Sequence, residues 1–204
     1  MDFKKLANQY RDELLDSVLP FWLEHSQDIE FGGYFSCLDR EGKVFDTDKF
    51  IWLQGREVWM FSMLYNKVEK RQEWLDCAVQ GGKFLKKYGH DGNYNWYFSL
   101  DRSGRPLVEP YNIFSYTFAT MAFGQLSLAT GNQEYADIAK KTFEIILSKV
   151  DNPKGKWNKL HPGTRNLKNF ALPMILCNLA LEIEHLLDPG YLEQTMETCI
   201  HEVM

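Results

Sequence analysis

A repeated unit constrains the fold of this 204-residue chain more than any other feature. The segment YFSCLDREGK that begins at Tyr34 returns as YFSLDRSGR at Tyr97, and Leu38 and Leu100 lie 62 positions apart. Further along, Tyr135 and Ala139 occupy the places of Trp74 and Ala78 at an offset of 61. Self-similarity at this period indicates a repeat fold whose units bury their apolar faces by stacking on neighbours.

Apolar positions every three or four residues predict helices over residues 3–25, 52–67, 72–88, 112–129, 133–150, 167–187 and 191–203, with Pro20 disturbing the first of them. Short β-hairpins are expected at 32–45 and 97–105, and the looser segment 151–166 replaces a third hairpin. The helices that begin near Trp52, Asn112 and Phe170 are apolar nearly all round, whereas their partners alternate with charges. We therefore expect an all-α toroid with inner and outer helix layers.

The usual closed form of such a toroid is the (α/α)6 barrel, and the expected elements supply about seven of its twelve helices. We predict that residues 1–204 form a single domain, an incomplete barrel with hairpins between its helix pairs.

The amino-acid composition excludes some classes of function. Lys and Arg number 23 and Asp and Glu 28, which gives a net charge of −5 and argues against nucleic-acid binding. Aromatic residues make up 15%, a surplus that often lines a pocket. The N-terminal residues lack the apolar core of a signal peptide, and the apolar stretch 170–181 is shorter than the ~20 residues of a membrane span, so we expect a soluble cytoplasmic protein.

Neither metal nor redox chemistry is indicated. The four cysteines (Cys37, Cys77, Cys177, Cys199) form no CxxC motif and have no histidine at zinc-finger spacing, which favours scattered thiols in a reducing compartment. None of the five histidines stands at a convincing spacing from a carboxylate, so no general base is evident.

The segment FIWLQGREVW holds the strongest candidate for a functional side chain. Arg56 stands in the first turns of a mostly apolar inner helix, where a guanidinium needs an anion, a carbonyl or an aromatic face to offset desolvation. Either it lines a pocket, or it pairs with a carboxylate such as Glu57 or Asp48. Trp52 and Trp59 share one helix face, which fits core packing and equally a sugar-stacking platform.

Two further segments are weaker candidates. Tyr111 to Phe118 places polar groups among rings at the start of the next inner helix, although each could be a satisfied core hydroxyl. The loop with Lys154, Gly155 and Lys156 could cradle phosphate, but it lacks the spacing of a P-loop and fits a solvated basic turn better.

The segments GGYFSCLDREGKVF, DKFIWLQGREVW, YFSLDRSGRP, IFSYTF and FALPMILCNLALE together resemble the N-terminal half of the N-acylglucosamine 2-epimerase family, renin-binding-protein type. The resemblance runs from about residue 5 to the end of the chain. Cellobiose 2-epimerases and aldose–ketose isomerases share the fold but commonly carry Tyr at the place of Phe114 and His at that of Ile175. These differences favour the N-acylhexosamine branch.

The resemblance implies an (α/α)6 barrel that interconverts N-acetyl-D-glucosamine and N-acetyl-D-mannosamine by ring opening and proton exchange at C2. It implies a catalytic role for Arg56 and substrate binding by Trp52, Gln54, Tyr111 and Phe114. It also implies no required cofactor, with ATP as a possible activator at Lys154, Gly155 and Lys156, and a homodimer. The family's two catalytic histidines belong to the second half of the barrel, so we expect the isolated 204-residue half to be inactive.

Three alternatives stay open at this point. The chain could be a non-catalytic helical-repeat module that binds a carbohydrate or a protein through its inner face. It could belong to a cellobiose or mannose 2-epimerase or isomerase of the same fold. A glycoside hydrolase is the weakest of the three, because only Glu57 and Glu109 stand near the expected rim and they form no convincing carboxylate pair.

Overall fold

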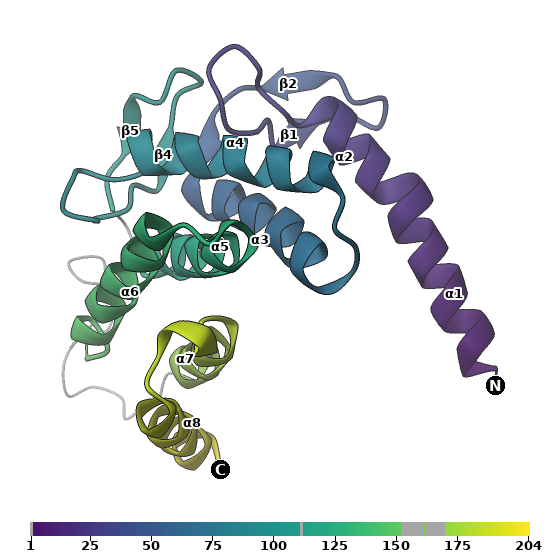
Figure 1. Ribbon diagram of the computed structural model, residues 1–204. Helices are drawn as coiled ribbons and strands as arrows, with labels where there is room; N and C mark the ends of the chain where they lie inside the picture. The colour runs from purple at the N-terminus through teal and green to yellow at the C-terminus, as the bar shows by residue number, and fades with distance from the viewer. Residues whose placement is uncertain (1, 111, 152–160, 162–169) are drawn as a thin grey trace.

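The computed structural model describes residues 2–110, 112–151, 161 and 170–204, and in it the helices follow an arc (Figure 1). The chain opens with one continuous helical rod made of α1 (Phe3–Glu13), a π-helical segment (Leu14–Val18) and α2 (Leu19–His25). Pro20 lies at the start of α2, where a missing N–H and a fixed φ are best tolerated. The expected helix over 3–25 is therefore confirmed, with a π-helical segment just before its proline.

Six further helices follow in three pairs: α3 (Ile51–Lys67) with α4 (Gln72–Tyr88), α5 (Phe114–Thr130) with α6 (Gln133–Ser148), and α7 (Ala171–Glu182) with α8 (Pro189–Val203). A short 3₁₀-helix (Glu184–Leu186) links the last two. Within each pair the two helices pack together, and α3, α5 and α7 also pack on one another in turn (Figure 1). Across the described residues this confirms the predicted seven helices in two layers.

Local signals explain where these helices begin and end. The Asn132 side chain accepts a hydrogen bond from the Glu134 N–H at 2.9 Å and starts α6. Asp188 does the same for the Tyr191 N–H, with Pro189 next in the chain, and starts α8. At the far end of α5, Gly131 has a φ of 67° and ends the helix in the left-handed conformation.

The two hairpins repeat each other closely. β1 (Cys37–Leu38) pairs with β2 (Val44–Asp46), and β4 (Ser99–Leu100) pairs with β5 (Pro106–Val108), each antiparallel and each with a register shift. In the turns, Asp39 N–H donates to the Lys43 carbonyl at 3.0 Å and Asp101 N–H to the Arg105 carbonyl at 2.9 Å. The predicted repeat is confirmed down to its turn hydrogen bonds.

A third short strand joins the repeats to each other. β3 (Lys49–Phe50) lies immediately before α3 and pairs with β4 of the second hairpin, which gives a sheet of order β3-β4-β5. The first turn of α3 is thereby tied to the hairpin that precedes α5. This arrangement gathers the hairpins beside the N-terminal ends of the inner helices α3 and α5 (Figure 1).

One continuous core lies between the layers, built on large buried rings that include Phe61, Trp74, Trp96 and Phe123. Inner helices approach closely at Gly55, where a Cβ would come within 2.8 Å of the Phe118 backbone. No helix in the described part of the chain is both long and apolar enough to span a bilayer. The third connection, 151–166, lies outside the described residues apart from its ends and His161.

Candidate functional site

The candidate site is an aromatic and cationic surface on the inner helices α3 and α5. Trp52, Arg56 and Trp59 follow one another at helical spacing on α3 and therefore share a face. The Arg56 guanidinium carbon lies 5.3 Å from the centre of the Phe118 ring on α5. The Trp52 ring lies 6.2 Å from the same phenyl ring at an angle of 48°. Phe118 thus supports both the charge and the indole from the neighbouring helix.

Arg56 is exposed, whereas the sequence predicted a buried pocket arginine. Among the described residues it forms no ion pair, and neither Glu57 nor Asp48 is its partner. The expectation of burial was wrong for a physical reason: nothing in the described part of the chain covers the concave side of the inner helices. The cationic group therefore faces solvent, with one aromatic ring at its back.

Glu57 points away from this surface, although it adjoins Arg56 in sequence. It hydrogen-bonds the Ser26 hydroxyl at the end of the first helical rod. Burial raises the pKa of the Glu57 carboxyl to about 8, so it is mostly protonated at neutral pH. Glu57 is a structural acid between helices and does not line the inner face. Glu109 is exposed just after β5.

A carboxylate that the sequence did not single out does lie beside this surface. Glu182, at the end of α7, accepts a hydrogen bond from the Trp59 indole N–H at 2.9 Å and another from the Gln125 amide at 3.0 Å. Gln125 in turn accepts from the Asn66 amide through its carbonyl and its side-chain oxygen. This network links α3, α5 and α7 and fixes the plane of the Trp59 ring. In the sequence, Glu182 is the single acid that ends the apolar segment LALE, and this position could have marked it as a candidate.

Gln54 has its side chain fully occupied elsewhere. Its Oε1 accepts from the Tyr34 N–H and its Nε2 donates to the Tyr34 carbonyl, both at 2.8 Å, and the residue is buried. Both polar atoms of the amide therefore bind the backbone that leads into the first hairpin. In this structure Gln54 positions that segment against α3, and its amide is not presented to a ligand.

The remaining predicted site residues divide into two groups. Phe114 is 43% exposed at the start of α5, where its N–H donates to the Asn112 side chain at 2.8 Å. Its ring is therefore available at the N-terminal end of α5, beside the hairpins. Tyr111, Lys154, Gly155 and Lys156 lie outside the described residues.

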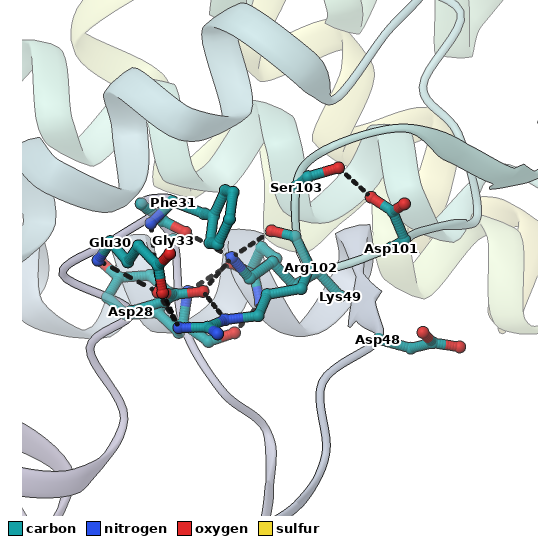
Figure 2. Close-up of polar contacts among 12 residues, drawn as sticks. Asp28, Glu30, Phe31, Gly33, Asp48, Lys49, Asp101, Arg102 and Ser103 are labelled. Atoms are coloured by element: carbon teal, nitrogen blue, oxygen red, sulfur yellow. Dashed lines mark hydrogen bonds and ion pairs between the residues drawn. The ribbon is translucent and has the colours of Figure 1, made fainter.

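Beneath the hairpins lies a buried ion cluster that holds the start of α3 in place (Figure 2). Lys49 is 0% exposed, and its Nζ donates to Asp28 Oδ2 at 2.9 Å, to the Gly32 carbonyl at 2.6 Å and to the Arg102 carbonyl at 2.9 Å. The Arg102 guanidinium binds both oxygens of Asp28, at 2.9 and 3.1 Å. All three ammonium protons are used, so the cluster joins three separate segments.

Charge pairing overcomes burial at Asp28. Burial raises the pKa of the Asp28 carboxyl, but hydrogen bonds from Arg102 and Lys49 outweigh it and hold the pKa below its ordinary value. At Lys49 burial has the larger effect: it lowers the pKa of the ammonium group, and the hydrogen bond to Asp28 offsets only part of that shift. The described residues contain no group of three His, Cys, Asp or Glu side chains placed to hold a metal ion.

The fold defines the class, that of the α/α-toroid proteins, and in this chain the inner helices present an arginine and indole rings. The cellobiose 2-epimerase of Bacillus thermoamylovorans has the same fold, with a TM-score of 0.81 at 22% identity over 97% of this chain and 55% of that one. The D-mannose isomerase structure follows with a TM-score of 0.75 at 17% identity, over 92% of this chain and 48% of that one.

Sequence comparison identifies the family within this class. Residues 33–204 match the family model for N-acylglucosamine 2-epimerase (GlcNAc 2-epimerase). The chain is 41% identical to the N-acylglucosamine 2-epimerase of Bos taurus over 174 residues, which are 83% of this chain and 41% of the relative. It is thus a member of the N-acylglucosamine 2-epimerase family, and it spans less than half the length of this curated relative.

Proposed function

We propose that this chain forms the arginine-bearing wall of an amino-sugar 2-epimerase site, which binds N-acetylglucosamine and N-acetylmannosamine. One observation carries the proposal: Arg56 is exposed on the inner face without an ion pair among the described residues, backed by Phe118 and flanked by Trp52. Indole and phenyl faces stack against the apolar face of a sugar ring, while a guanidinium binds its oxygens. The family membership supports the same substrate class.

The chemistry requires a fixed positive charge. Removing the C2 proton of an open-chain aldose places negative charge on the carbonyl oxygen, and a preorganised cation stabilises that developing oxyanion. Arg56 supplies such a charge on the inner face, and the Phe118 ring, whose centre lies 5.3 Å from its guanidinium carbon, restrains it from behind. No metal or cofactor is needed for this step, and we propose none.

Proton transfer needs groups that we assign to a part of the site beyond these 204 residues. The described histidine contacts lie away from Arg56: His25 packs on Phe21, His90 on Tyr94 and Trp96, and His185 approaches Ser127. We therefore propose that the chain binds the sugar without catalysing its epimerisation. We also propose that it does so in the cytoplasm, where its four free cysteines stay reduced.

We further propose that ATP activates the enzyme by binding at Lys156. Loss of nucleotide binding in the Lys156→Ala variant would support this, and unchanged nucleotide binding would contradict it.

The test has two measurements on the purified chain. Titration with N-acetylmannosamine followed by NMR should show binding that Arg56→Ala weakens at least tenfold, whereas Arg40→Ala in the exposed first hairpin turn leaves it unchanged. Incubation in deuterated water should show no exchange at C2 of the sugar. Exchange by the chain alone, or equal binding by the Arg56 and Arg40 variants, would overturn the proposal.

A competing sugar class is separated in the same titration. Phe114 stands exposed at the rim, where a phenyl ring offers stacking but no hydroxyl. Cellobiose 2-epimerases commonly carry Tyr at this place, and Phe114 lacks the hydroxyl of that side chain. N-acetylmannosamine should therefore bind more tightly than cellobiose. Tighter binding of cellobiose would instead favour the cellobiose 2-epimerase alternative.

A further inference from the structure

The Trp59 side chain lies on the inner face, one helical turn further along α3 than Arg56. Three residues separate the two positions, a rise of about 4.5 Å along the helix. Because the Cα–Cβ bond of a helical residue tilts toward the helix N-terminus, the half-buried indole leans toward the turn that carries Arg56. A ligand held by the Arg56 guanidinium therefore lies within reach of the Trp59 ring.

The indole N–H of Trp59 is held from the far side of α5. Trp59 belongs to α3 and Glu182 ends α7, and α5 packs against both helices (Figure 1). The Trp59 Nε1 donates to Glu182 Oε2 at 2.9 Å. Since α6 packs on the outer side of α5, this hydrogen bond lies on the concave side, next to the candidate site. The indole therefore presents its ring, and not its N–H, to a ligand.

Glu182 is itself fixed, because the end of α7 packs closely on α5. Ile183 is fully buried, and a Cβ at Gly124 would lie 2.5 Å from Ile183 Cγ2. The Gln125 amide donates to the Glu182 backbone carbonyl at 3.2 Å and to its Oε2 at 3.0 Å. Gln125 is 5% exposed, and its own Oε1 accepts from Asn66 at 3.0 Å. The carboxylate is thus held through backbone and side chain together, as the support of a binding site requires.

We propose that Glu182 is a positioning residue for the sugar site, and that it holds the Trp59 ring as the floor of that site through the indole N–H. This role rests on the proposed function and extends the site to α7. A ring that is already held in place loses little conformational freedom when a ligand stacks on it, so binding is tighter. With its N–H taken by Glu182, Trp59 recognises the apolar face of a sugar and not its hydroxyls.

The experiment titrates the 204-residue chain with N-acetylmannosamine and follows the indole N–H resonances by NMR. Glu182→Ala should weaken binding about three- to tenfold and shift the Trp59 N–H resonance, which Trp59→Phe identifies by its absence. Glu182→Gln keeps an acceptor oxygen and should restore both the affinity and the resonance toward the wild-type values. Glu184→Ala removes an exposed acid two residues further on, and as the matched control it should change neither.

A double-mutant cycle separates positioning from direct contact with the sugar. If Glu182 acts through the Trp59 N–H, Glu182→Ala should not further weaken binding by Trp59→Phe, which already lacks that N–H. Additive losses in the double variant would show that the carboxylate contacts the sugar itself. Equal losses in Glu182→Gln and Glu182→Ala would show the same. Either result would overturn the positioning role.

The positioning role and the proposed function fail in different ways. A wild type that binds no N-acetylmannosamine would overturn the proposed function, and this role with it. Equal binding by the wild type and Glu182→Ala, or an unchanged Trp59 resonance in that variant, would leave the site standing and overturn the positioning role alone. Circular dichroism checks that each variant keeps its helix content.

Discussion

Among single residues, Glu57 gives the clearest pH dependence. Its pKa is about 8 in the folded chain, raised by burial from the ordinary value near 4.5. The folded state therefore holds this proton more tightly than the unfolded state, so stability is full below pH 4.5 and falls as pH rises toward 8. The slope from this group is about 1.4 kcal/mol per pH unit in that window.

Glu57→Gln should remove that slope, because the amide keeps a hydrogen bond to Ser26 and cannot ionise. We expect the variant to melt at a higher temperature than the wild type at pH 8 and to differ little at pH 4.5. Thermal unfolding at both pH values measures this. Exposed Glu24→Gln is the control. A constant difference between Glu57→Gln and the wild type at both pH values would contradict the expectation.

Lys49 supports a second prediction at this scale. Lys49→Met removes three buried donors, one each from the Gly32 carbonyl, the Arg102 carbonyl and Asp28 Oδ2. Breaking a buried ion pair in this way costs about 3–5 kcal/mol. Urea unfolding should show that loss, whereas Lys43→Met, on the exposed first turn, should change stability by less than ~0.5 kcal/mol. Equal effects would show that the cluster contributes little.

At the scale of elements, a hairpin turn and a helix end depend on glycine for two separable reasons. Gly104 has a φ of 92°, and a Cβ there would lie 2.6 Å from the Tyr88 ring, whereas Gly131 has a φ of 67° with open space around it. Gly131→Ala should cost only the left-handed strain, about 1 kcal/mol. Gly104→Ala adds a steric clash and should cost roughly 2–4 kcal/mol in urea unfolding. A smaller loss at Gly104 than at Gly131 would contradict this.

The same scale shows what the sequence can predict. The bounds of α4 and the 62-residue repeat of the hairpins follow from local pattern, and the structure confirms both. The site depends on distant partners. Trp59 meets Glu182 across 123 residues, and the Gln54 amide is taken by the Tyr34 backbone. The exposure of Arg56 depends on what covers the inner face, which no local pattern encodes.

For the whole molecule, one continuous core runs from Leu14 and Leu15 of the first rod to Leu176 and Leu179 of α7. We therefore expect the chain to unfold in a single cooperative transition. Urea unfolding followed by tryptophan fluorescence and by far-UV circular dichroism measures this. Transitions that do not coincide would contradict the expectation and show that the two ends of the arc unfold separately.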